Sequence, residues 1–388
     1  MGVNEALQLM LVCAGAYIMP FVSRKLMLPS SVAELFFGML IGTFIFSSGE
    51  GLGLIKHLSN VGFVLLMYIA GMELDFDRVS ALHRREIIAY TGYALLLAGG
   101  SLAASVLTGM PVFFALVIMT SAVGMLFSVL KELNIVKTEL GQTILLIGAI
   151  CEVLTLIGIT VVSLVAQTGG TTDTVFQVAG ILVFVIVVLV SVRILRLFLW
   201  WRPEMKPFFM SVGGSSEIGV RANLFNMSIF VALAVFVDME AILGAFFGGM
   251  VFALLFADRE EMLERLSSFG YGFLIPLFFI EVGTRFKFTD FMSFEVIRGA
   301  LLVTLMIFLV RCAATLPLML TRLKKRELIY VPLAGSFPLT LLVAVSTMGE
   351  KLGIIDRSQS SVIILTAIIT AIFYPWLMKI VNKAVSVS

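Results

Sequence analysis

Residues 140–166 read LGQTILLIGAICEVLTLIGITVVSLVA, a run of 27 residues with a single charged side chain, Glu152. A helix needs about 20 mainly apolar residues to cross the hydrocarbon core of a bilayer, so this run predicts a membrane-spanning helix with a carboxylate near its middle. Hydrophobic residues make up 60% of the 388-residue chain and charged residues 13%, whereas soluble domains contain about 25% charged residues. The composition therefore predicts an all-α polytopic membrane protein.

Similar apolar runs recur along the whole chain. Around 31–47 and 218–257, two short runs could be re-entrant segments instead of full crossings. We predict thirteen transmembrane helices, near residues 6–22, 31–47, 54–72, 86–108, 111–130, 140–166, 174–199, 218–237, 239–257, 269–284, 295–320, 328–349 and 359–380.

The distribution of Lys and Arg gives an independent test, because loops rich in these residues stay in the cytoplasm. Alternate loops carry 20 of the 27 basic residues on one side of the membrane and 6 on the other, and Arg311 falls inside a helix. This bias predicts an external N-terminus and a cytoplasmic C-terminus, which requires an odd number of helices. We expect an integral protein of a cell membrane, either a prokaryotic inner membrane or a plasma membrane.

The most polar internal stretch is 200–217, which leaves six helices and a linker helix before it and six helices after it. Two six-helix halves separated by one odd helix must insert in opposite orientations. The pattern predicts two inverted six-helix repeats, an arrangement found in many secondary transporters.

Two ionisable residues inside predicted helices are candidates for an ion site. A carboxylate is costly to bury in a bilayer and usually faces a cavity or a partner, so Glu152 is a candidate proton or cation site. The alternative is a neutral Glu152 that bonds a neighbouring helix. Arg311 stays protonated in proteins and could be a fixed counter-charge for Glu152. Alternatively, its side chain could extend toward the cytoplasmic end of its helix.

Two predicted helices contain sequences that interrupt helical hydrogen bonding. The fifth helix has Thr120 and Ser121 at mid-membrane, and the twelfth has Ser336 close to Pro338, a residue without a backbone donor. Freed carbonyls and hydroxyls are hard oxygen ligands that suit an alkali cation. Each break lies in the fifth helix of its half, as expected of crossed discontinuous helices in an inverted repeat.

Other acidic residues are less decisive. Glu281 lies near a predicted helix end, where it either lines a cavity or pairs with Arg285, and Glu34 is either a helix-start residue or an entrance carboxylate. The chain has no HExxH, GxSxG, Walker or GxGxxG pattern, so we expect neither an enzyme nor a bound cofactor. The net charge of +2 gives no case for nucleic-acid binding.

Several of these stretches together resemble cation:proton antiporters of the Kef-like and NapA-like branch. They are 28–42, 65–75, Thr120–Ser121 with 129–133, 243–251 and 275–283, in the same order and spacing. The resemblance implies a thirteen-helix fold with a dimerisation domain, a mobile core domain, homodimers and elevator-type alternating access. It places Glu152 at the essential acidic position of the sixth helix, with Cys151 in place of the usual polar neighbour, and Arg311 near the basic residue of the eleventh helix.

The same resemblance divides the chain into five segments. They are 1–110, first-half dimerisation helices and the start of the core; 111–173, core helices with the first break and Glu152; 174–217, linker helix and cytoplasmic loop; 218–294, second-half dimerisation helices; and 295–388, core helices with Arg311 and the second break.

We therefore expect exchange of Na⁺ or K⁺ for H⁺ at Glu152, with Cys151, Thr120, Ser121 and Ser336 as further candidate ligands. One exchanging carboxylate predicts electroneutral transport. Two alternatives stay open: sodium-coupled symport of an organic anion held by Arg311, and a sensor that keeps the fold without transport.

Overall fold

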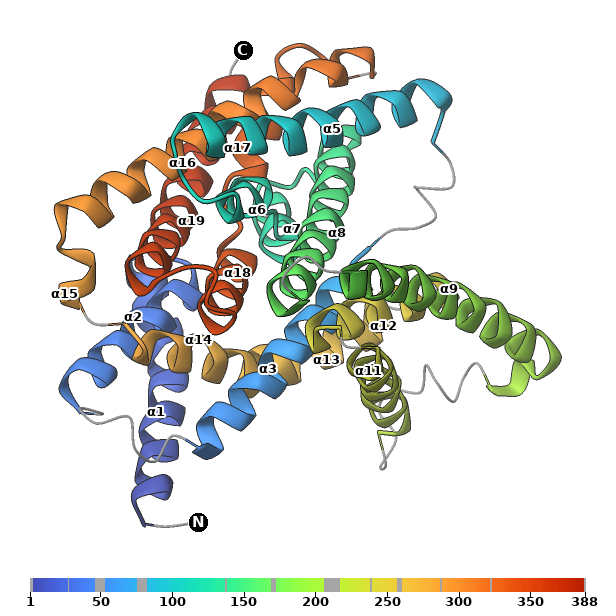
Figure 1. Cartoon of the computed structure of the whole chain (residues 1–388), viewed down its shortest axis with the longest axis horizontal. Helices are drawn as coiled ribbons and strands as arrows, with labels where there is room; N and C mark the ends of the chain where they lie inside the picture. Colours follow the sequence, from blue (N-terminus) through green and yellow to red (C-terminus); the bar gives the residue numbers. More distant parts are fainter. Residues whose placement is uncertain are drawn as a thin grey trace. The chain divides into compact units, whose positions relative to one another are not determined.

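The computed structural model describes residues 3–26, 28–45, 53–74, 82–136, 138–168, 172–205, 217–237, 239–256, 260–286, 288–321 and 323–386. Within these ranges the regular structure is helical, without strands (Figure 1). The α-helices are α1 (Val3–Leu26), α2 (Ser30–Phe44), α3 (Gly53–Met72), α5 (Arg84–Leu107), α6 (Phe113–Met119), α7 (Val123–Glu132), α8 (Glu139–Thr168), α9 (Thr172–Trp201), α11 (Ile218–Phe236), α12 (Ala241–Leu255), α13 (Glu260–Phe269), α14 (Ile275–Thr284), α15 (Phe288–Phe291), α16 (Phe294–Ala314), α17 (Tyr330–Gly335), α18 (Leu339–Lys351) and α19 (Arg357–Ser386). Single turns of other helix types are η1 (Pro203–Met205), η2 (Gly270–Leu274), η3 (Leu316–Leu320) and η4 (Glu327–Ile329).

The predicted all-α membrane architecture is confirmed. Each of the thirteen predicted ranges coincides with helix, and the described residues contain nine helices that are long and apolar enough to cross a membrane. Two further apolar helices, α2 and α12, have 15 residues each and are therefore about 22 Å long. They are the short elements that the sequence indicated.

Both predicted helix breaks are present. The fifth predicted helix is divided into α6 and α7, and the backbone of Thr120 leaves the helical region with φ −54° and ψ 134°. The twelfth is divided into α17 and α18 at Ser336, Phe337 and Pro338. The helix restarts after the proline because the carbonyl of Pro338 can accept from Leu342 N–H at 2.9 Å.

One predicted boundary was wrong. The helix predicted to begin at residue 269 already begins at Glu260, so Arg265 lies within α13 and not in a loop. The cause is an amphipathic first turn, in which Met262 and Leu266 are buried while the charged residues face outward. A π-helical turn, η2, joins α13 to α14 and precedes Pro276, which cannot donate a backbone hydrogen bond.

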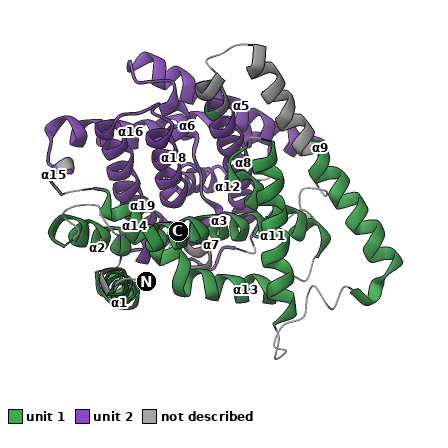
Figure 2. Cartoon of the chain, turned by 60° about the horizontal axis from the view of Figure 1, so that its bottom comes forward, with its two compact units in different colours: residues 1–26, 33–76, 163–285 green, residues 27–32, 77–162, 286–388 purple. Residues whose placement is uncertain are grey.

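The chain forms two compact units (Figure 2). Unit 1 contains 1–26, 33–76 and 163–285, and unit 2 contains 27–32, 77–162 and 286–388. The chain therefore passes between the units five times. The assignment of these parts to a dimerisation domain and a mobile core remains a prediction.

In unit 1, α3 packs against α12, α13, η2 and α14. α3 and α12 approach closely because a glycine of each helix lies against the backbone of the other. Gly249 of α12 lies against the carbonyl of Tyr68, and Gly71 of α3 lies against the carbonyl of Phe246. The buried Tyr68 hydroxyl donates to Asn223 of α11 at 2.9 Å. Small residues thus allow the α3 and α12 backbones to approach closely, as is common between membrane helices. The buried Tyr68–Asn223 hydrogen bond joins α11 to this pair.

In unit 2, α16 packs against α5, α17 and α19, and α18 packs against α19 and α6. Hydroxyl groups join these helices inside the unit. Tyr374 of α19 donates to the carbonyl of Thr304 in α16 at 3.0 Å, and the hydroxyls of Ser346 and Ser360 lie 2.8 Å apart between α18 and α19. The long helices α5, α16 and α19 thus pack against the half-helices α6, α17 and α18.

We predict that Gly249→Ala lowers the thermal stability of the protein in detergent. An added methyl group would overlap the α3 backbone, and overpacking of this kind costs about 1–3 kcal/mol. Gly99→Ala is the matched control, because Gly99 is an exposed helical glycine with no atom within 4 Å of the added carbon. Equal melting temperatures for the two variants would contradict the importance of this contact.

Candidate functional site

Glu152 lies at the first helix break, within unit 2. It is 1% exposed in α8, and its Oε2 accepts from the backbone N–H of Val123 at 3.0 Å. Val123 is the first residue of α7, so the carboxylate meets the amide end of a helix. The helix dipole favours negative charge at this end.

Ser121 supplies a second oxygen near this carboxylate. The side chain is 2% exposed, and its hydroxyl has no hydrogen-bond partner among the residues that the structure describes. The hydroxyl lies against α8, since a Cβ added to Gly148 would be 3.5 Å from it. Gly148 is four residues before Glu152 and therefore on the same face of the helix. A buried hydroxyl without a protein partner is uncommon, and its oxygen is free to accept or coordinate.

Arg311 binds the other end of the same break. The residue is fully buried, and its Nη1 donates to the carbonyl of Ile118 at 2.7 Å. Its Nη2 donates to the carbonyl of Thr120 and, at 3.4 Å, to that of Met119. These are the carbonyls at the end of α6, which have no partners within the helix. The guanidinium therefore neutralises the negative end of this half-helix.

Arg311 also contacts the second broken helix. A Cβ added to Gly335, the last residue of α17, would lie only 2.8 Å from Arg311 Nε. The guanidinium thus lies against the carboxyl-terminal ends of both first half-helices, α6 and α17. The role of Arg311 as a fixed counter-charge for Glu152 remains a prediction, and among the described residues Arg311 makes no ion pair with this carboxylate. Its donors point to main-chain carbonyls instead.

The other predicted ligands are buried in unit 2 but already form local bonds. The hydroxyl of Thr120 donates to the carbonyl of Leu116 at 2.6 Å, and that of Ser336 donates to Pro332 at 2.5 Å. Their oxygen lone pairs can still accept or coordinate. Cys151 is 1% exposed, and its carbonyl accepts from Thr155 at 2.8 Å.

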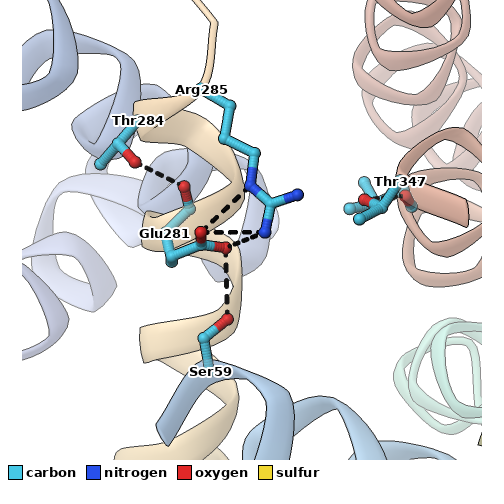
Figure 3. A network of polar contacts seen from close by, with 6 residues as sticks. Ser59, Glu281, Thr284, Arg285 and Thr347 are labelled. Carbon is cyan, nitrogen blue, oxygen red and sulfur yellow. Dashed lines mark hydrogen bonds and ion pairs between the residues drawn. The ribbon is translucent and has the colours of Figure 1, made fainter. Parts of the chain in front are cut away.

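The two remaining predicted carboxylates, Glu281 and Glu34, belong to unit 1. Glu281 forms an ion pair with Arg285 at 2.8 Å, as one of our two alternatives expected, and accepts from Ser59 (Figure 3). Glu34 is 4% exposed and lies near the start of α2. A role for either carboxylate in an ion pathway remains a prediction.

Sequence reasoning missed two groups that surround the break. Val123 donates to Glu152 through its backbone N–H, so the identity of the residue at position 123 gives no indication of this hydrogen bond. Gly148 was also missed, although a glycine four residues before an intramembrane carboxylate is a sign of close approach by another segment.

Comparison with known proteins assigns the family. The family described as "Sodium/hydrogen exchanger, transmembrane" matches residues 11–381. The chain belongs to the sodium/hydrogen exchanger family. The predicted resemblance to cation:proton antiporters is thereby confirmed at the level of the family, and the prediction that the protein is a transporter and not an enzyme agrees with it.

Individual relatives cover nearly all of the exchanger. The YjbQ protein of Bacillus subtilis (strain 168) is 28% identical over 414 residues, 99% of this chain, which spans 64% of that relative's length. A Na⁺/H⁺ antiporter of Enterococcus hirae is 23% identical over 393 residues, covering 97% of this chain and 98% of the relative. The solved structure of the sodium proton antiporter MjNhaP1 from Methanocaldococcus jannaschii has the same fold, with a TM-score of 0.70, 15% identity and 98% coverage of both chains.

We predict that Arg311→Gln destabilises the exchanger strongly. The substitution leaves the carbonyls at the end of α6 without a charged donor, and each such bond contributes about 1.5–3 kcal/mol. Thermal or detergent unfolding would measure the loss. Arg298→Gln is the matched control, because Arg298 is an exposed arginine of the same helix. Stability equal to that of the control would show that Arg311 does not hold the break.

Proposed function

We propose that this exchanger moves Na⁺ or K⁺ against H⁺, with Glu152 as the shared proton and cation site. The supporting observation is a buried carboxylate at the interruption of a helix, close to the unpartnered hydroxyl of Ser121. Carboxylate, hydroxyl and carbonyl oxygens are the ligands that hard cations prefer. The same carboxylate can instead hold a proton, so the two substrates compete for one group.

Arg311 has a supporting role in this proposal. Its charge is bound to main-chain carbonyls, so it keeps the break formed whether or not a cation is present. Both Nη atoms donate to main-chain carbonyls, so the guanidinium cannot use this pair of donors to bind a substrate carboxylate in a bidentate manner. This arrangement favours cation exchange over symport of an organic anion. Thr120, Ser336 and Cys151 are further candidate ligands in the same unit.

The exchange cycle follows from the competition at Glu152. On one side of the membrane, a cation displaces the proton; on the other side, a proton displaces the cation. We propose elevator-type alternating access, in which unit 2 carries the site and unit 1 forms a homodimer, with the N-terminus outside and the C-terminus in the cytoplasm. The division into two units and the membership of the family support this mechanism.

We predict that Glu152→Gln abolishes exchange while the protein still folds. Glutamine can accept the Val123 bond but cannot carry a charge that trades a proton for a cation. The measurement is cation-driven proton flux in proteoliposomes, followed with a pH-sensitive dye. Glu139→Gln is the matched control, because Glu139 is an exposed glutamate of the same helix. Undiminished flux in Glu152→Gln would remove Glu152 from the site.

Ser121→Ala should separate binding from turnover. Loss of one oxygen ligand is expected to raise the apparent KM for the cation about tenfold, which corresponds to about 1.4 kcal/mol of binding free energy. The maximal rate should change much less. An unchanged KM for Na⁺ and for K⁺ would show that the Ser121 hydroxyl does not coordinate the transported ion.

We predict that the exchange rate is independent of an imposed membrane voltage. One cation moves in one direction and one proton in the other, so no net charge crosses the membrane. The test compares flux at zero voltage with flux under a potassium diffusion potential, with sodium as the transported ion. A rate that follows the voltage would contradict a one-to-one exchange at Glu152.

A further inference from the structure

The Glu281–Arg285 ion pair of unit 1 lies outside the proposed ion site. Glu281 is 4% exposed in α14, a helix in which nine of the ten residues are buried. Both of its carboxylate oxygens are bound: Oε1 accepts from Arg285 Nε at 3.0 Å and Nη2 at 2.9 Å, and Oε2 accepts from Nη2 at 2.8 Å and from Ser59 at 3.4 Å (Figure 3). A carboxylate with this many donors has little capacity to bind a cation as well.

Apolar contacts already hold α14 in unit 1. On the α3 side, Phe63 stacks on Phe278 with ring centroids 4.7 Å apart, and Gly62 lies against the carbonyl of Leu274. On the α2 side, Gly38 and Gly283 allow the two backbones to approach closely. The Glu281 carboxylate is buried, whereas the Arg285 side chain is 36% exposed. A buried charge is costly to desolvate, and apolar residues often replace buried ionic groups without loss of stability. Cohesion of unit 1 therefore does not explain why this pair is charged.

The position of the pair in the chain suggests a different role. Arg285 is the last residue of unit 1, and Phe286 is the first residue of the next segment of unit 2. The ion pair spans the last turn of α14, where the Thr284 hydroxyl also donates to the carbonyl of Glu281 at 2.6 Å. The chain is thus fixed by side chains at the residue where it leaves the unit.

A second passage between the units has a similar contact. Ser163 is the residue at which α8 enters unit 1, and its hydroxyl donates to Glu240 Oε1 at 3.3 Å. Glu240 directly precedes α12, the helix that packs most closely on α3. At both passages, the residue at the boundary donates to a carboxylate of unit 1: Arg285 to Glu281 and Ser163 to Glu240.

We propose that Glu281 and Arg285 are positioning residues that anchor the exit of the chain from unit 1, so that unit 2 moves against a fixed attachment during exchange. This inference rests on the proposed elevator cycle. The pair acts on the rate of the conformational step, and it leaves cation binding at Glu152 unchanged.

The test compares Glu281→Gln, Arg285→Lys and the double variant Glu281→Gln/Arg285→Gln. Glu281→Gln leaves Arg285 without its carboxylate, and Arg285→Lys leaves the buried Glu281 with fewer donors, so each single variant is expected to lower the melting temperature. The double variant removes both charges and should recover the melting temperature. Its maximal exchange rate should nevertheless remain about tenfold below that of the wild type, a barrier change of about 1.4 kcal/mol, with an unchanged KM for Na⁺.

Arg265→Gln is the matched control, because Arg265 forms a more exposed ion pair within the same unit. It should leave rate and stability unchanged. Hydrogen exchange provides a second measurement: amides 282–285 should exchange faster in the double variant than in the control. A double variant with the wild-type rate, or with unchanged protection of these amides, would overturn the proposal.

The outcome can be separated from the fate of the proposed function. Absence of flux in the wild type, or undiminished flux in Glu152→Gln, would count against the exchange proposal. Wild-type flux that requires Glu152 but not the Glu281–Arg285 pair would overturn only the anchor.

Discussion

Arg311 and Glu152 close the two open ends of one interrupted helix, and the candidate site depends on this arrangement. A break inside a membrane exposes carbonyls at the end of α6 and amides at the start of α7, where no water replaces the lost partners. The guanidinium binds the carbonyls, and the carboxylate binds the first amide. The guanidinium thus meets the negative end of the α6 dipole and the carboxylate meets the positive end of the α7 dipole, and among the described residues the two charges form no ion pair with each other.

This separation has a chemical consequence. If Arg311 were paired with Glu152, a cation would have to displace a guanidinium before it could bind. Here the arginine stays with the backbone, and among the described residues a single hydrogen bond, from the Val123 N–H, competes for the carboxylate. We propose that a proton or a cation can therefore exchange at Glu152 while the break keeps its structure. The Glu281–Arg285 pair of unit 1 is the opposite case, because its charges bind one another and saturate the carboxylate.

Much of the fold was predictable because each helix carries its own signal. The apolar runs and the break residues Thr120, Ser121 and Pro338 are local features, and the structure has helices and interruptions at these positions. The start of α13 was missed because a helix with only Met262 and Leu266 buried does not differ from a polar loop in composition. Glu152 and Arg311 also stood out as candidates in the sequence, since intramembrane charges are rare.

The sequence by itself determined that this chain is a helical membrane protein with two interrupted helices and two charges in its apolar core. Hydrophobic length and the loss of helical donors are properties of short segments, so they can be read without knowing the partners. Only the tertiary structure decided which group binds which. Arg311 reaches carbonyls more than 190 residues away, and Glu281 binds both Arg285 and a serine from another helix. Such choices depend on which helix ends meet in space, which no local pattern specifies.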